Sequence, residues 1–190
     1  MFHRLGLLLE ITGSHGIMRR YFVVNGFDGA LTMLGIIVGF AVSAPADPGV
    51  VISACLGAAI ALGVSGVSSA WVSEAAERRK ALRDLERAMM TSLEESAHGR
   101  AARWVPLLIG AVNGLAPLLI SLLIITPLWL ARLGVAFPVS PLHAAIAVAL
   151  AVVFSLGVFL GRLSGISWLR SGLQTLAIAL VTIGLVFFLG

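Results

Sequence analysis

The chain alternates between long apolar runs and short polar breaks. Five runs, at roughly 21–43, 50–73, 104–130, 141–161 and 167–189, are each long enough to cross a bilayer as a helix, which takes about 20 mostly apolar residues. The runs are longer than barrel strands and do not alternate between polar and apolar positions, so helices are favoured. The pattern predicts an all-α integral membrane protein with five transmembrane helices.

The amino-acid composition also indicates a membrane protein. Hydrophobic residues make up 59% of the sequence and charged residues 12%, which is far more apolar than a water-soluble domain of this length requires. The single cysteine, Cys55, lies in the second run, so no disulfide can form within the chain.

Basic residues indicate the orientation. With the amino terminus in the cytoplasm, Arg132 is the one residue of thirteen lysines and arginines that falls on the outer side. Such a bias is typical of cytoplasmic loops, and an odd number of spans then places the carboxyl terminus outside. The net charge of +4 is accounted for by this topology, so we expect no nucleic-acid partner.

Two polar segments complete the predicted organisation. Residues 1–20 are expected to form an amphipathic helix on the inner membrane surface, ending at a turn near 13–16, and residues 21–190 to form the transmembrane domain. The second span is expected to continue as helix into a short cytoplasmic insert at about 74–103, with a break near Gly99, because this segment is rich in Ala, Leu, Glu and Arg.

The most informative residue is Asp28, the single charge in an apolar stretch from Tyr21 to Ala44. A carboxylate deep in a bilayer costs on the order of 3 kcal/mol on insertion scales and by default marks a function. At helical spacing it shares one stripe with Asn25, Thr32, Gly35 and Gly39. Small residues let another backbone approach closely, so we expect this stripe to face a helix interface or a water-filled path.

Hydroxyls follow one another at helical spacing in the second span. Ser65, Ser69 and Ser73 are four residues apart, and the series reaches Glu77 at the cytoplasmic end. They either line a route inward from solvent or pack tightly and bond back to their own helix.

The third span contains Asn113, Gly114 and Pro117 close together. This group predicts either a local break that frees backbone carbonyls for an ion or a packing kink.

The insert carries a mixed set of oxygen, thioether and imidazole groups. Glu86, Met90, Glu94 and His98 fall along one side of a continuous helix, with Met89 and Glu95 adjacent. Such donors suit a divalent transition metal. Glu95 and His98 also make one Glu-x-x-His step, the element that di-iron bundles use twice. The alternative is an ordinary solvated helix with Glu/Arg pairs.

Catalytic patterns are not evident. The sequence offers no Ser/His/Asp set, His cluster or Gly-rich phosphate loop, and His143 lies at the outer edge of the fourth span, so we do not expect an enzyme. A membrane-bound iron-binding or ferroxidase storage module, which would rely on Glu95 and His98, and a non-transporting scaffold are the alternative functions.

Four segments together resemble the vacuolar iron transporter family, most of all its small prokaryotic members. They are RRYFVVNGFDGALTMLGIIVGF, SSAWVSEAAERRK, GAVNGLAPLL and the RSGL that opens the last span. The resemblance covers essentially the whole chain, and its most specific part is the Asp-Gly pair in the first span.

The resemblance implies a homodimer in a prokaryotic cell membrane that exports Fe²⁺ or Mn²⁺ from the cytoplasm, by exchange for protons. It implies a path near the two-fold axis with Asp28 as a transport residue, and no permanently bound cofactor. It also implies that the insert gathers metal through Glu86, Met89, Met90, Glu94 and Glu95. On this basis we expect Asn25, Asp28, Thr32, Ser69, Ser73 and Glu77 to line the path.

Two positions depart from the family pattern. Better-studied members carry a methionine and a glutamate in the second span, and this chain has Gly66 and Ala70 at the corresponding places.

Overall fold

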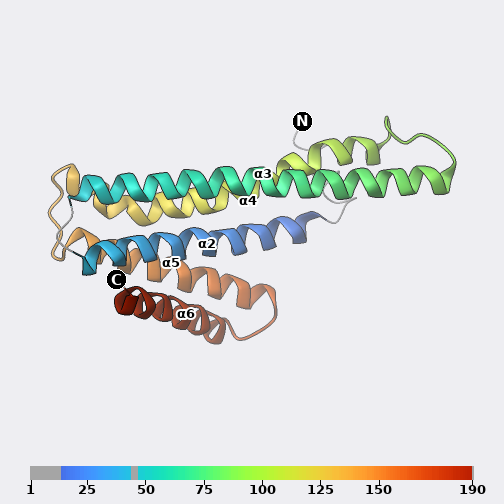
Figure 1. Cartoon of the computed structure of the whole chain (residues 1–190). Helices are drawn as coiled ribbons and strands as arrows, with labels where there is room; N and C mark the ends of the chain where they lie inside the picture. The colour runs from blue at the N-terminus through green and yellow to red at the C-terminus, as the bar shows by residue number, and fades with distance from the viewer. Residues whose placement is uncertain (1–13, 44–46, 190) are drawn as a thin grey trace. The chain divides into compact units, whose positions relative to one another are not determined.

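The computed structural model describes residues 14–43 and 47–189, and all regular structure in these ranges is helical (Figure 1). The helices are α2 (Ser14–Val42), α3 (Pro48–Met89), α4 (Ala97–Arg132), α5 (Pro141–Leu163) and α6 (Trp168–Leu189). These five helices are long and apolar enough to cross a membrane. The prediction of five spanning helices is confirmed at this level, and the chain is a multi-pass helical membrane protein.

Local side chains and glycines set several helix ends. The Asp47 Oδ1 atom accepts a hydrogen bond from the Gly49 amide at 2.6 Å at the start of α3, and Ser140 Oγ accepts from the His143 amide at 3.4 Å at the start of α5. These bonds satisfy amides that have no partner within the first helical turn. After α5 the chain leaves the helix through Gly165 at φ +68°, a conformation that favours glycine.

The first described helix starts earlier than expected. Gly16 lies inside α2, so the turn expected at 13–16 does not extend to this residue. The rest of the predicted amphipathic helix, residues 1–13, lies outside the described residues.

The long second helix is confirmed, but its end is not where the sequence suggested. Helix α3 has 42 residues and ends at Met89, and Met90 adopts a left-handed φ of 51°. The chain then forms an irregular connection over 90–96 before α4 begins, so the break predicted near Gly99 was wrong by several residues. Glu86 explains the position of the break, because its Oε1 accepts a hydrogen bond from the Leu93 amide at 2.8 Å and holds the reversed chain.

Helix α4 runs without interruption from Ala97 to Arg132. Of the two alternatives at Asn113, Gly114 and Pro117, a break in the helix is therefore absent, and the packing kink stays a prediction.

The chain divides into two compact units, each of which we describe by itself. In the first unit, residues 63–115 pack the second half of α3 against the first half of α4. A small core of Ala70, Ala101, Val105 and Ile109 is joined by Ile17, Met18 and Tyr21 from the start of α2.

Glycines allow the two helices of the first unit to approach closely. A Cβ atom added at Gly66 would lie 2.9 Å from the Asn113 carbonyl oxygen and 3.0 Å from the Gly114 Cα atom. The Asn113 side chain donates a buried hydrogen bond from Nδ2 to the Gly66 carbonyl at 2.8 Å. Backbone packing and one interhelical hydrogen bond thus hold this pair together, as is common where apolar burial adds little inside a membrane.

The second unit contains residues 23–43, 47–62 and 116–189 of the described chain and has the larger core. Met33, Leu34 and Ile37 of α2 are fully buried with Ile124 and Leu128 of α4. Helices α5 and α6 also pack against each other in this unit (Figure 1).

Candidate functional site

Asp28 lies on an outward face of α2. Its side chain is exposed, whereas the neighbouring Gly29 and Ala30 are buried in the core of the second unit. A Cβ atom at Gly29 would lie 2.8 Å from the backbone of Pro117, so this glycine permits the close approach of α4. The helix thus presents its apolar side to the core and its one carboxylate to the outside of the unit.

The rest of the predicted stripe shares this open face. Asn25 and Thr32 are half-buried, and Gly35 has no atom within 4 Å of an added Cβ. Gly39 meets a single neighbour at 3.9 Å, the Cγ1 atom of Val186. The close helix packing that we expected of the glycines occurs at Gly29 within this chain, and the Gly35 surface stays available.

The serine series on α3 is exposed as well. Ser65, Ser69, Ser73 and Glu77 all belong to the outward side of the first unit. Ser69 Oγ donates to the Gly66 carbonyl at 3.4 Å, which matches the second of our two interpretations for this hydroxyl. The Asp28 stripe and the serine series belong to different units.

The predicted metal set of the insert does not form one helical stripe. Glu86 and Met89 belong to α3, Met90, Glu94 and Glu95 lie in the connection, and His98 belongs to α4. The helical spacing on which the set was based ends at Met89, because the left-handed Met90 turns the chain away. The stripe expected from periodicity was wrong for this reason.

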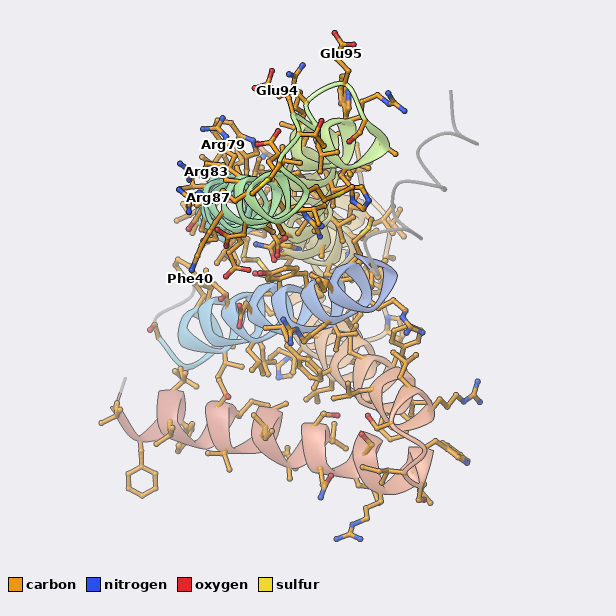
Figure 2. All side chains as sticks on the ribbon, turned by 90° about the vertical axis from the view of Figure 1, so that its right-hand side faces the viewer. Phe40, Arg79, Arg83, Arg87, Glu94 and Glu95 are labelled. Carbon is orange, nitrogen blue, oxygen red and sulfur yellow. The ribbon has the colours of Figure 1, made fainter. Side chains whose placement is uncertain are left out.

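Exposure nevertheless leaves several of these donors accessible. Met89 and Met90 are 56% and 94% exposed, and Glu94 and Glu95 project from the end of the first unit (Figure 2). Glu86 differs, since one of its oxygens already binds the Leu93 amide. Within the described ranges, no group of three or more His, Cys, Asp or Glu side chains is placed to hold a metal ion.

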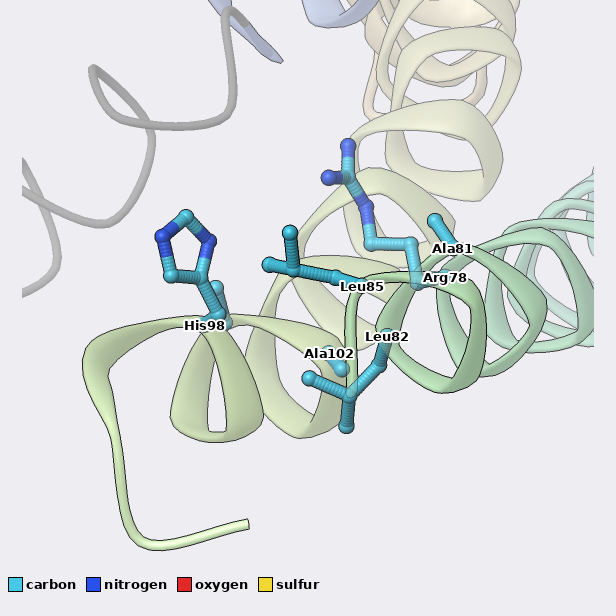
Figure 3. Close-up of a pocket in the computed structure, with 7 residues that line it drawn as sticks. Arg78, Ala81, Leu82, Leu85, His98 and Ala102 are labelled. Atoms are coloured by element: carbon cyan, nitrogen blue, oxygen red, sulfur yellow. The ribbon is translucent and has the colours of Figure 1, made fainter. Parts of the chain in front are cut away.

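His98 has a different environment from the one that a Glu-x-x-His site requires. It lines a pocket of about 120 Å³ together with Arg78 and apolar side chains such as Leu82 and Leu85 (Figure 3). A guanidinium group in the same pocket disfavours a metal cation there. The backbone carbonyl of Glu95 accepts from Arg100 Nη1 at 2.7 Å, so this residue also lies beside a cation.

Gly66 and Ala70 of the second span both face α4. Gly66 contacts the α4 backbone, and Ala70 is buried in the small core of the first unit. A methionine or glutamate at these places would collide with this packing. The bond between Asn113 and Gly66 was not foreseen, although a buried asparagine next to glycines in an apolar run signals an interhelical partner.

Fold and site together define a multi-pass helical membrane protein with one carboxylate on the open face of a spanning helix. The chain is 31% identical over 186 residues to the uncharacterized protein MJ0645 of Methanocaldococcus jannaschii, and the alignment covers 96% of this chain and 93% of that protein. The chain belongs to the family of this archaeal protein. No family model matches the chain, and no solved structure matches it.

Proposed function

We propose that this protein is a homodimeric transporter that exports Fe²⁺ or Mn²⁺ from the cytoplasm in exchange for protons. The observation that carries the proposal is the exposed carboxylate of Asp28 in the otherwise charge-free apolar part of α2. Left facing lipid, this group would cost on the order of 3 kcal/mol, so it needs either a polar path or a partner.

A second copy of the chain would supply both the polar path and the partner. The open surface around Gly35 lets another α2 approach, and two facing copies would bring two Asp28 side chains together at the two-fold axis. Asn25 and Thr32 would then add an amide and a hydroxyl beside the carboxylates. Oxygen donors of this kind suit Fe²⁺ and Mn²⁺.

Two facing carboxylates also provide a way to couple metal to protons. In a low dielectric, two negative charges a few ångströms apart repel strongly and require either a proton or a cation between them. Binding of M²⁺ from the cytoplasm would release the proton to that side. When the metal ion leaves to the outer side, a proton would bind the carboxylates from there. This exchange would couple the two fluxes at Asp28 itself.

The charged half of α3 and the connection that follows it would serve delivery from the cytoplasmic side. Exposed Met89, Met90, Glu94 and Glu95 would collect metal loosely, and Glu77 would lead it along Ser73 and Ser69 toward the membrane. This arrangement rests on individual accessible donors, since the described residues hold no preformed cluster. Weak collection is adequate, because a transporter must release its ion as well as bind it.

Transport by purified protein tests the proposal. We expect proteoliposomes with wild-type protein to accumulate Mn²⁺ or Fe²⁺ when a proton gradient is imposed, and Asp28→Asn to abolish this uptake. Asp84→Asn is the matched control, because Asp84 is an exposed aspartate on the polar half of α3 and carries the same charge change. Wild-type flux in Asp28→Asn, or equal loss in both variants, would overturn the assignment.

A further inference from the structure

A groove of about 590 Å³ lies along the first unit, between the polar half of α3 and the start of α4. Three arginines line it, Arg79 and Arg83 from α3 and Arg103 from α4. Trp71 and Leu107 line the same groove and are 45% and 47% exposed. The groove thus combines concentrated positive charge with an apolar surface.

Within the described part of the chain, none of the groove arginines forms an ion pair. The ion pairs there are Glu74–Arg78 at 3.6 Å and Asp84–Arg87 at 3.7 Å, and neither involves a groove arginine. Arg83 Nε donates to a backbone carbonyl, that of Arg79, at 3.3 Å. Arg79 and Arg83 lie one helical turn apart on the same side of α3 (Figure 2).

Two glutamates also line the groove, at the end away from the membrane. Glu86 is bound to the Leu93 amide and lies about 22 Å from Trp71 along the helix axis, at 1.5 Å per residue. Glu94 belongs to the connection beyond it. Their charges lie beside Arg83, which is three residues from Glu86, about 4.5 Å along the axis, and they are far from the end of the groove that holds Trp71.

The positions of these residues along the helix axes match the layers of a bilayer surface. Trp71 and Leu107 lie where the apolar runs end, and tryptophan is enriched at that boundary. Arg103 is one helical turn beyond Leu107, about 6 Å, and Arg79 about 12 Å beyond Trp71. The polar headgroup region is roughly 5–8 Å thick on each side of the hydrocarbon, so Arg103 lies at headgroup level. Arg79 begins beyond this region, and its long side chain can reach back toward the headgroups.

We propose that this groove binds the headgroup of an anionic phospholipid. The phosphate lies between Arg79 and Arg103, whose forked guanidinium groups bind phosphate oxygens in pairs. The acyl chains lie along Trp71 and Leu107. The apolar end of the groove is the reason to assign a lipid rather than free phosphate, and the assignment does not depend on what the protein transports.

Native mass spectrometry of the full-length protein in neutral detergent tests this site with defined lipids. We expect phosphatidylglycerol to bind more tightly than phosphatidylcholine of the same chain length. The double variant Arg79→Gln/Arg103→Gln should bind phosphatidylglycerol at least tenfold more weakly, since each basic residue near an anionic surface contributes roughly fivefold. Size-exclusion profiles and thermal stability establish that the variants are folded.

A charge-matched double variant separates a defined site from general electrostatic attraction. Arg87→Gln/Arg100→Gln removes two charges from the same two helices but none from the groove lining, and should change phosphatidylglycerol binding less than twofold. Equal weakening by both double variants, or no weakening by either, would overturn the proposal.

A competition experiment distinguishes the two sources of phosphate. Inorganic phosphate at millimolar concentration should not displace bound phosphatidylglycerol, because it gains nothing from Trp71 and Leu107. In nanodiscs, brominated phosphatidylglycerol should quench tryptophan fluorescence more than brominated phosphatidylcholine, and Trp71→Leu should remove the difference. Displacement by phosphate would indicate a site for free anions, and equal quenching by the two lipids would show that the site does not select an anionic headgroup. Either result would overturn the proposal.

Discussion

Replacing Gly66 with alanine should separate the two helices of the first unit and destabilise the protein. The added Cβ would lie 2.9 Å from the Asn113 carbonyl oxygen and 3.0 Å from the Gly114 Cα atom. Ordinary carbon–carbon contacts are about 3.5–4.0 Å, so the α4 backbone must move away by roughly 0.5–1 Å. Both obstructing atoms are backbone atoms, and no rotamer change can relieve the contact.

The cost can be worked out from three contributions. Overpacking of this kind costs about 1–3 kcal/mol. The Asn113–Gly66 hydrogen bond, now 2.8 Å, would stretch toward the limit of bonding, and interhelical bonds in membranes contribute about 0.6–2 kcal/mol. The higher helix propensity of alanine offsets roughly 0.5–1 kcal/mol of this loss in unfolding free energy. We expect a net loss of about 2 kcal/mol in unfolding free energy.

Gly57→Ala is the matched control on the same helix. No atom lies within 4 Å of a Cβ added at Gly57, so this variant should keep only the gain in propensity. The assay is unfolding by sodium dodecyl sulfate in mixed micelles, followed by far-UV circular dichroism. Asn113→Ala should also cost less in the Gly66→Ala background than in wild type, because the bond is already weakened. A Gly66→Ala protein as stable as Gly57→Ala would refute the reasoning.

Two other predictions concern α2 and the connection after α3. In a Cys55→Ala background, Gly35→Cys should form a disulfide-linked dimer in membranes treated with a mild oxidant. Val181→Cys, at an exposed position on α6, is the control and should not form this dimer. Equal cross-linking at both positions would contradict the proposed interface. Glu86→Ala should speed hydrogen exchange of the Leu93 amide roughly fivefold by removing its acceptor, while Glu86→Gln keeps an oxygen and should preserve protection. Unchanged exchange in Glu86→Ala would show that the connection does not depend on this bond.

Sequence patterns predicted the spanning helices well, because bilayer thickness imposes a length that the apolar runs display directly. The extension of α3 as far as Met89 was also predictable from helix propensity. The end of α3 was not, since a methionine rarely adopts positive φ and no local signal marks Met90. The reversal depends on Glu86 reaching an amide seven residues away, which helical periodicity does not describe.

The candidate site was predictable only in part for a related reason. Spacing placed Asp28 on one stripe with Gly35, and both lie on the open side of α2. Spacing could not say which glycine meets a helix of the same chain, and that residue is Gly29. The groove arginines were treated as topology signals, because only the packing of α3 against α4 brings Arg103 to Arg79 and Arg83.

The fit between Gly66 and Asn113 has a mechanical consequence for the hairpin of α3 and α4. Two antiparallel helices can slide past each other in steps of one turn, about 5.4 Å. A slide of one turn toward the polar end would place Asn113 opposite Ala70, where a Cβ occupies the space that the glycine leaves open. The fit therefore opposes a slide in that direction. Within the first unit, an axial shift of α3 that would bring Ala70 to Asn113 must carry α4 with it.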